Sequence, residues 1–397
     1  MRAKGALHGG CPFAHNYGRK AVISSRKLCG TAPVSKTGPQ DGKRRVLVLS
    51  VLLALGTTVG AAWAKDPGFP PPTGDPSVLP SGAKLDRVFD GGCTLTEGVA
   101  TSPDGMVYFS DITFTTRCKD PSGKYLQAGN IWKWDPKTKQ ATIFRSPSGM
   151  SNGMKFDAEG NLIIAEGADF GGRRLTKTDM KTGKSYILSG LYDGQPYNAL
   201  NDLTIDEKGR IYFTDPRYLG HETMAQPVQA VYRLDPDGKV LRLITDAGKP
   251  NGIQVSPDQK TLYVLSHDNG AHDFLEKGET AQKGLMACLA YSLAPDGTVS
   301  NRRILIDWLP NDGGDGMTVD VDGNLYIAVR SEAAPGLYVY SPQGKQLAYV
   351  STGKELPTNV AFGYGGDANL LYLTSGKSLY TIRMAKDGYH LKNQSRS

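Results

Sequence analysis

The stretch DGMTVDVDGNLYI, residues 315–327, contains the pattern that decides the fold. Asp315 leads into a run of alternating polar and apolar residues, Asp322-Gly323 is a turn signal, and an apolar run follows to Ile327. Alternation is typical of a strand with one buried face, and an Asp-Gly pair between two such runs is typical of a β-hairpin. The stretch therefore predicts two antiparallel strands joined by a tight turn.

The same pattern occurs six times in the chain. The copies begin at Glu97, Asn152, Asn201, Asn251, Asp315 and Thr358, at spacings of 43 to 64 residues. Most copies are followed by a second pair of strand-like runs, such as the one from Val231 to Leu234. Four strands per repeat at this period are typical of a propeller blade. The sequence therefore predicts an all-β fold, a six-bladed β-propeller with four-stranded blades.

The last repeat has no room for a fourth strand after the run from Leu379 to Arg383. The run from Leu85 to Phe89 can supply that strand, which would pair the N-terminal strand with the last blade and remove two free sheet edges. We therefore expect a ring closed by an N-terminal strand and a propeller over residues 83–397. Residues 65–82 are rich in Pro and Gly and are expected to be a linker rather than core.

Residues 43–64 have the order of a secretory signal peptide. Three basic residues precede an apolar run over 46–60, and a small-x-small triplet ends at Ala64. A membrane anchor is the alternative, but a spanning helix needs about 18 or more apolar residues and this run is shorter. We expect cleavage after Ala64 and export to the periplasm or the medium. Residues 1–42 are expected to be a disordered leader, or to lie upstream of the true start site.

The composition favours a large all-β domain without a nucleic-acid surface. Apolar residues make up 39% of the 397-residue chain, and its 48 glycines indicate many turns. The formal net charge is +7, but much of the excess lies in the first 45 residues. The remainder is near neutral, so we expect no nucleic-acid partner, and we expect no stable membrane insertion after signal cleavage.

Three cysteines belong to the predicted mature chain: Cys93, Cys118 and Cys288. An oxidising compartment permits a disulfide between Cys93 and Cys118, but the spacing does not demand one, and buried free thiols are equally compatible with it. The sequence contains no CxxC pair, and it has no serine-hydrolase, zinc-protease or phosphate-loop motif. Serine-triad and nucleotide chemistry are therefore not expected.

The polar residues that begin the repeats are the main candidates for a functional site. The first strand of each propeller blade lines the central channel, so residues at the same phase of each repeat would form a ring. Glu97, Asn152, Asn201, Asn251 and Asp315 would supply carboxylate and amide oxygens to this ring, with Thr358 at the sixth position. Such oxygens are the ligands that a hard cation such as Ca²⁺ prefers.

A simpler interpretation is that each Asn-Gly or Asp-Gly pair only makes a turn, and for any single pair that interpretation is favoured. The polar residue, however, precedes the strand at the same phase in five repeats, whereas the hairpin turns come later, as at Asp104-Gly105. Glu97 and Asp315 on one axis would also repel each other without a cation. Together these points favour the ring.

Weaker candidates follow the second strand of several repeats. They are Asp111, Asp215, Arg217, His267 and Asp268. Strand ends on one face could form the rim of the channel. Most residues in such positions are ordinary loop residues, so we rank them below the ring.

From about Leu85 to the C-terminus the chain resembles the regucalcin/gluconolactonase family of calcium-dependent six-bladed β-propellers, also called senescence-marker-protein-like. The likeness is strongest at Glu97-Gly98, Asn201-Asp202, Pro250-Asn251-Gly252 and residues 314–320. The resemblance implies that Glu97, Asn251 and Asp315 bind the metal. It also implies that Asn201 contacts the substrate, and that Asn152 is a further metal-facing and substrate-binding residue.

The resemblance implies metal-dependent hydrolysis of a cyclic ester, with a cation polarising the lactone carbonyl and Asp315 acting as general base. Ca²⁺ is the expected cation, and Mg²⁺, Mn²⁺ or Zn²⁺ are also compatible with oxygen ligands. Ala199 stands where animal regucalcins carry an Arg thought to orient the sugar lactone, so the resemblance does not settle the substrate. The alternatives are an organophosphate-type phosphotriesterase and a non-catalytic propeller binding module with a structural cation.

Overall fold

The computed structural model describes residues 68–114, 117–270 and 282–392, and the regular secondary structure of these residues is almost entirely β-strand. They contain one short 3-10 helix, η1 (Gly365–Asp367), and no helix of the length and apolarity that crossing a bilayer requires. The predicted leader (1–42) and signal peptide (43–64) lie outside the described ranges, as do residues 271–281.

Six antiparallel sheets follow one another along the chain as six blades. The first strands are β3 (Leu95–Thr101), β7 (Ser151–Phe156), β13 (Leu203–Ile205), β17 (Pro250–Val255), β21 (Gly314–Val319) and β25 (Pro357–Phe362). The second strands are β4 (Val107–Ile112), β8 (Leu162–Glu166), β14 (Ile211–Asp215), β18 (Thr261–His267), β22 (Leu325–Val329) and β26 (Leu370–Ser375). The third strands are β5 (Asn130–Asp135), β9 (Arg174–Thr178), β15 (Ala230–Leu234), β19 (Met286–Leu293), β23 (Gly336–Tyr340) and β27 (Ser378–Arg383). The outer strands are β6 (Gln140–Arg145), β10 (Ser185–Ser189), β16 (Val240–Ile244), β20 (Val299–Asp307), β24 (Gln346–Ser351) and β2 (Asp86–Asp90).

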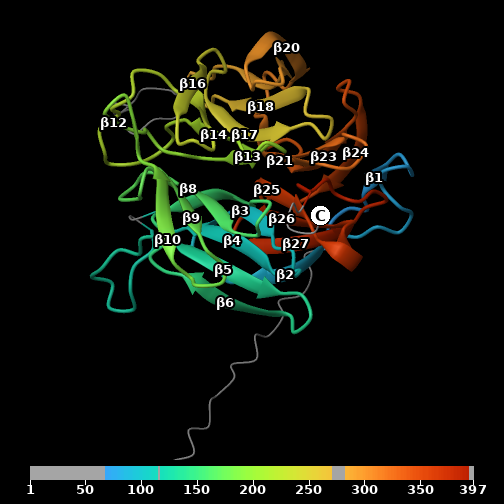
Figure 1. Cartoon of the computed structure of the whole chain (residues 1–397). Coiled ribbons are helices and arrows are strands. Elements are labelled where there is room, and N and C mark those ends of the chain that lie inside the picture. Colours follow the sequence, from blue (N-terminus) through green and yellow to red (C-terminus); the bar gives the residue numbers. More distant parts are fainter. Residues whose placement is uncertain (1–67, 115–116, 271–281, 393–397) are drawn as a thin grey trace, which may run out of the picture. The chain divides into compact units, whose positions relative to one another are not determined.

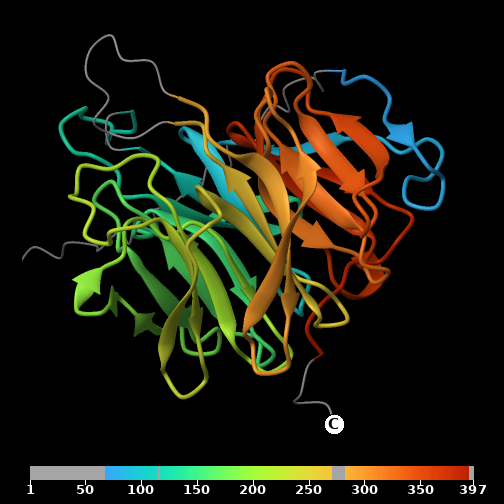
Figure 2. The same ribbon diagram turned by 90° about the horizontal axis from the view of Figure 1, so that it is seen from above.

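The six blades close into a ring. The first strand of every blade contacts the first strands of both neighbouring blades, and β25 of the last blade contacts β3 of the first. Figure 1 shows β13, β21 and β25 gathered near the middle, with β6, β10, β16 and β20 at the periphery, and Figure 2 shows the same blades from above. The N-terminal strand β2 pairs with β27, so that Asp86 lies opposite Thr381. The predicted six-bladed propeller and its N-terminal closing strand are both confirmed.

The core of the propeller lies between the blades. The described residues form six buried apolar clusters, one at each interface between neighbouring blades. Between the fourth and fifth blades, for example, Leu265 of β18 packs with Met317 and Ile327. Second strands such as β22 are buried along their whole length, whereas the outer strand β20 is mostly exposed. A strand covered on both faces needs apolar residues at successive positions, which explains runs such as residues 325–329.

The segment before β2 is part of the folded domain, so the expectation of a linker over residues 65–82 is wrong for its described part. A short strand, β1 (Thr73–Gly74), pairs with β24 at the edge of the fifth blade. Val78 and Leu79 are buried in the cluster between the fifth and sixth blades, and Phe69 packs against it. These apolar side chains are scattered among Pro and Gly residues, which hides them from a reading of composition.

A short hairpin, β11 (Leu191–Tyr192) with β12 (Gln195–Pro196), connects the second blade to the third. After β27 the chain continues across the C-terminal ends of the inner strands. The Tyr389 N–H donates to Val319 O over 3.0 Å, and Gly388 forms an isolated bridge with Asp320. This segment lies where the inner strands end, away from the ring residues at which they begin.

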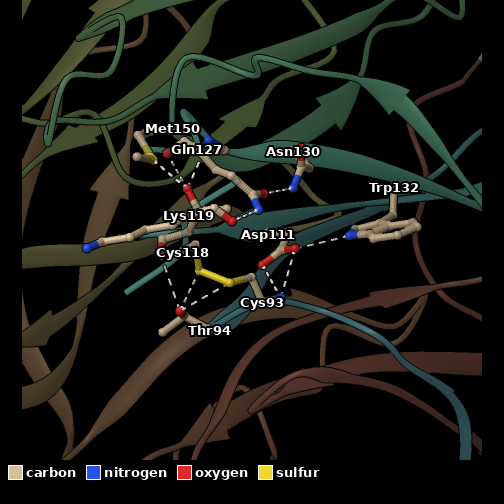
Figure 3. Close-up of a disulfide and its surroundings, with 11 residues drawn as sticks. Cys93, Thr94, Asp111, Cys118, Lys119, Gln127, Asn130, Trp132 and Met150 are labelled. Carbon is tan, nitrogen blue, oxygen red and sulfur yellow. Dashed lines mark hydrogen bonds between the residues drawn. A yellow bond between two sulfur atoms is a disulfide. The ribbon is translucent and has the colours of Figure 1, made fainter. Parts of the chain in front are cut away.

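A disulfide joins Cys93 to Cys118, whereas Cys288 is a buried free thiol. The sequence left this pairing open. Figure 3 shows the bridge beside Thr94, whose hydroxyl lies 3.0 Å from Cys118 Sγ. Nearby, Asp111 accepts hydrogen bonds from the Cys93 N–H and from Trp132 Nε1. The bridge therefore ties the chain before β3 to the loop after β4.

Replacing both Cys93 and Cys118 by Ser should lower the free energy of unfolding by about 3 kcal/mol, because the bridge closes a loop of 25 residues in the unfolded chain. Urea denaturation measures the change. The wild type in reductant should unfold like the double variant, and reductant should not change the double variant further. Equal stability of the two proteins without reductant would contradict a stabilising bridge.

Candidate active site

The ring residues sit where the first strands are irregular. In five blades the pairing of the first strand with the second shifts register at or next to the polar residue, as between Glu97 and Val99 in β3 and between Gly314 and Met317 in β21. A bulge of this kind re-aims a side chain that regular pleating would direct elsewhere. The Asn-Gly and Asp-Gly pairs of these strands are thus not hairpin turns.

The glycines of these pairs allow the first strands to approach one another at the axis. A Cβ on Gly98 would overlap the carbonyl of Asn152 in the next blade. A Cβ on Gly252 would similarly meet the carbonyl of Asp315. Each glycine therefore allows the polar residue of its own blade and the polar residue of the neighbouring blade to lie close together, so that the ring is narrow.

The five predicted site residues line one cavity of about 270 Å³ at the starts of the inner strands. Their residue exposures are small: 4% for Glu97, 7% for Asn152, 8% for Asn201, 4% for Asn251 and 6% for Asp315. Thr358, at the sixth position, is not in the cavity wall, because its Oγ1 donates to Thr96 O of the adjacent blade over 2.7 Å. The sixth blade thus closes the ring without contributing to the cavity surface.

Glu97 and Asp315 form a coupled pair of buried carboxyl groups. Burial raises the pKa of Glu97 well above its ordinary value, and the Asp315 charge raises it further. Burial also raises the pKa of Asp315, against the lowering effect of the Arg330 guanidinium, whose Nη1 lies 3.2 Å from Asp315 Oδ2. The two carboxyl groups therefore resist ionising together, and additional positive charge in the cavity would favour the doubly ionised state.

The amide groups of the wall have the arrangement that a cation would need. Asn152 Oδ1 is buried and has no hydrogen-bond partner. Asn251 Nδ2 donates to the Tyr218 hydroxyl over 3.1 Å, and the Asn251 side chain also hydrogen-bonds to Asp315. Only the oxygen of an amide can ligate a cation, so the contact with Tyr218 uses the part of Asn251 that a cation does not need.

Two carboxylates, an unpartnered amide oxygen and further amides fit a hard divalent cation. Within the described ranges there is no group of three or more His, Cys, Asp or Glu that could hold a metal ion. A cation in this cavity would therefore depend on the Asn residues as well as on Glu97 and Asp315.

The residues that end the second strands divide into two groups. Asp111, Glu166 and Asp215 are buried anchors: Glu166, for example, accepts hydrogen bonds from Arg145, Arg174 and Thr176. His267 and Arg330, which end or follow β18 and β22, instead line the cavity. Arg217, also ranked low from the sequence, is buried and donates to the carbonyls of Asn198 and Gly220.

Arg330 and Tyr218 are two polar cavity residues that the sequence analysis did not single out. Arg330 follows a second strand just as His267 ends one, so that repeat phase could have indicated it. Tyr218 lies in the loop after β14, where its hydroxyl donates to His267 O over 3.0 Å. Burial places the pKa of Tyr218 well above its ordinary value, so the hydroxyl keeps its proton.

Asp215 holds the loop that carries Asn201. Its carboxyl accepts hydrogen bonds from the N–H groups of Asn198, over 3.0 Å, and Ala199, over 2.7 Å. Burial raises the pKa of Asp215 to about 7 in spite of these hydrogen bonds. Because this pKa lies above that of the unfolded chain, about 4, the stabilising effect of the protonated group is complete below pH 4 and is lost as the pH rises to 7.

Asp215→Asn should destabilise the protein by about 1–3 kcal/mol at pH 5, because Asn leaves one of the two N–H donors without an acceptor. The difference in free energy of unfolding between variant and wild type should narrow towards pH 8, because Asp215 ionises in the wild type and Asn cannot ionise. Urea denaturation at the two pH values measures both quantities, with the exposed Asp237→Asn variant in a turn of the same blade as the control for charge removal. A difference in free energy of unfolding that widens with pH would contradict the raised pKa of Asp215.

These features define a class of protein: a six-bladed β-propeller with a buried carboxylate and amide cavity at one end of its channel. The family model described as "SMP-30/Gluconolactonase/LRE-like region" matches residues 95–377 of the chain. The chain belongs to this family, which confirms the resemblance found from the repeats.

Known relatives of this family are similar to the chain over most of the propeller. Gluconolactonase from Zymomonas mobilis is 29% identical over 277 residues, which cover 63% of this chain and 71% of the relative. Lactonase drp35 from Staphylococcus epidermidis is 27% identical over 321 residues, covering 76% and 87% of the two chains. The solved gluconolactonase of Xanthomonas campestris shares the fold, with a TM-score of 0.64 at 24% identity over 79% of this chain and 95% of the other.

Proposed function

We propose that the protein is a metal-dependent hydrolase of cyclic esters, a gluconolactonase-like lactonase. The observation that carries the proposal is the buried Glu97–Asp315 pair beside the unpartnered Asn152 Oδ1 in an open cavity. The lactonase names of two relatives support the reaction class.

Glu97, Asn251, Asp315 and Asn152 are the residues that would hold the cation, with Ca²⁺ the best match to an all-oxygen set. When bound, such an ion polarises the ester carbonyl and offsets the negative charge that develops on its oxygen. A positive charge in the cavity also lets Glu97 and Asp315 ionise together, because it opposes the two effects that raise the pKa of Glu97, burial and the Asp315 charge.

Asp315 is the proposed general base. It takes a proton from the attacking water as the water oxygen bonds to the carbonyl carbon, and it returns that proton to the ring oxygen when the acyl–oxygen bond breaks. Arg330 fixes the orientation of the Asp315 carboxylate, because its Nη1 lies 3.2 Å from Asp315 Oδ2. The product is the open-chain hydroxy acid.

Asn201 and Asn152 are proposed to position the substrate. Asn201 is held at the cavity by Asp215 through the neighbouring N–H groups of Asn198 and Ala199. Amide groups fixed in this way can hydrogen-bond to the ester oxygens and hold the carbonyl near the attacking water, which lowers the entropic part of the barrier.

The test is hydrolysis of simple δ-lactones by chelator-stripped protein, with Ca²⁺, Mg²⁺, Mn²⁺ and Zn²⁺ added back one at a time. We expect turnover to disappear on stripping and to return with at least one cation. Tight cation binding without any ester hydrolysis would overturn the proposal and leave a structural cation site.

We further propose that the chain is exported, because the predicted signal peptide at 43–64 precedes a domain with a disulfide, and disulfides persist mainly in oxidising compartments. N-terminal sequencing of protein recovered outside the cytoplasm should begin at Lys65. Protein that retains residues 43–64 in the cell would contradict export.

A further inference from the structure

The cavity wall has two chemically different sides. Beside the polar ring, the first three blades contribute a mainly apolar surface, which also includes Asp169 and Tyr218; its apolar members are Leu95, Ile112, Phe114, Met150, Ala168 and Leu219. The fourth and fifth blades contribute His267, Asn269 and Arg330. A ligand that fills the cavity therefore meets mainly apolar side chains on one side and polar or charged groups on the other.

The apolar side follows directly from strand geometry. Leu95 lies two residues before Glu97 on β3, and residues two apart in a strand point to the same face. Leu95 pairs with Ile112 across the first blade, whereas Glu97 pairs with Ser110. Leu95 and Ile112 therefore form the layer next to Glu97, and Phe114 continues it in the loop that the Cys93–Cys118 bridge anchors.

Several of these apolar side chains are partly exposed in the free protein. Leu219 is 48% exposed although it lines the cavity, and Leu95, Ile112 and Phe114 are half-buried. An apolar ligand group would cover them and gain the corresponding hydrophobic free energy. Hydroxyl groups of a sugar lactone placed against Leu95, Phe114 and Leu219 would lose water without gaining hydrogen-bond partners from these side chains, which is unfavourable.

We propose that the substrate is a lactone whose ring carries an alkyl or aryl substituent in place of hydroxyl groups, and that the substituent lies against Leu95, Phe114 and Leu219. The inference rests on the proposed lactonase function for the position of the ester at the polar ring. The substituent adds binding energy away from the reacting carbonyl, so that it raises kcat/KM for the apolar lactone over the unsubstituted ring.

Three δ-lactones with the same ring test the proposal: δ-valerolactone, δ-decalactone and D-glucono-1,5-lactone. We expect kcat/KM for δ-decalactone to exceed that for δ-valerolactone about 10-fold or more, because each buried methylene adds affinity. We expect the glucono lactone to be the poorest of the three. A glucono lactone that matches or exceeds δ-decalactone overturns the inference while leaving the lactonase assignment intact.

Leu219→Asn should reduce the ratio of the δ-decalactone to δ-valerolactone kcat/KM values about 3- to 10-fold. The matched control is Leu191→Asn, because Leu191 is 56% exposed on the β11–β12 hairpin and is absent from the cavity wall. The control should keep the wild-type ratio. A Leu219 variant with the wild-type ratio contradicts the placement of the substituent.

Calorimetric binding of two lactams, 6-pentyl-2-piperidone and 2-piperidone, gives a second readout that needs no turnover. At least 10-fold tighter binding of the pentyl compound supports the apolar wall, and equal binding overturns it. If no lactone were hydrolysed, the proposed function would fail, and this pair of affinities would still decide whether the cavity selects an apolar substituent.

Discussion

Asp315→Asn should lower kcat/KM for lactone hydrolysis about 10³-fold or more while the propeller stays folded. General-base catalysis alone contributes about 10²- to 10⁴-fold, and Asp315 is also one of the two carboxylates proposed to hold the cation. Asn is nearly isosteric with Asp and keeps an oxygen for Arg330 Nη1, which lies 3.2 Å from Asp315 Oδ2. Steady-state kinetics on δ-lactones measures the loss, and circular dichroism verifies the fold.

The matched control is Asp322→Asn, because Asp322 lies in the hairpin turn of the same blade and its side chain is 52% exposed. This variant should keep the wild-type rate. An Asp315→Asn protein that is folded and retains at least a tenth of the wild-type activity would remove Asp315 from the chemistry.

Glu97→Gln should change stability in opposite directions with and without cation. Without cation, burial and the Asp315 charge both disfavour ionised Glu97, and Gln removes this penalty, so the variant should be at least as stable as the wild type. With cation at about 100 times the dissociation constant, the wild type gains about 2.7 kcal/mol from binding, and the variant should lose most of this gain. Thermal denaturation with chelator and with Ca²⁺ measures the stability without and with cation. Lactone hydrolysis should fall because the variant binds the cation more weakly.

Glu159→Gln serves as the control for loss of one carboxylate, because Glu159 is exposed in the turn between β7 and β8. It should show the same cation-dependent stabilisation as the wild type. If Glu97→Gln were stabilised by Ca²⁺ as strongly as the wild type, Glu97 would not be a ligand.

The position of each residue within its repeat was enough to predict the fold and to predict a common site for five residues that line one cavity: Glu97, Asn152, Asn201, Asn251 and Asp315. The reason is physical: a ring of similar blades places residues of equal phase at equal positions around the axis. Thr358 has the same phase, but its hydroxyl is used between blades, a contact that depends on the neighbouring β3 and β26. The position of a residue within the repeat therefore places it near the axis but does not fix the direction of its side chain.

The sequence was less informative where packing depends on loops. Tyr218 reaches the cavity from an irregular segment that no repeat predicts. Val78 and Leu79 are buried only because the N-terminal segment folds back onto the last two blades, which composition does not indicate. The Cys93–Cys118 bridge likewise depends on the path of the loop after β4, so cysteine spacing left it open.

The most direct test of a cation site on the ring is a crystal structure of the protein grown with Ca²⁺. We expect an ion in the cavity, with carboxylate oxygens of Glu97 and Asp315 and the Oδ1 atoms of Asn152 and Asn251 at about 2.3–2.6 Å from it. A cavity without an ion at saturating Ca²⁺, or an ion bound elsewhere with Glu97 and Asp315 uncoordinated, would contradict the account.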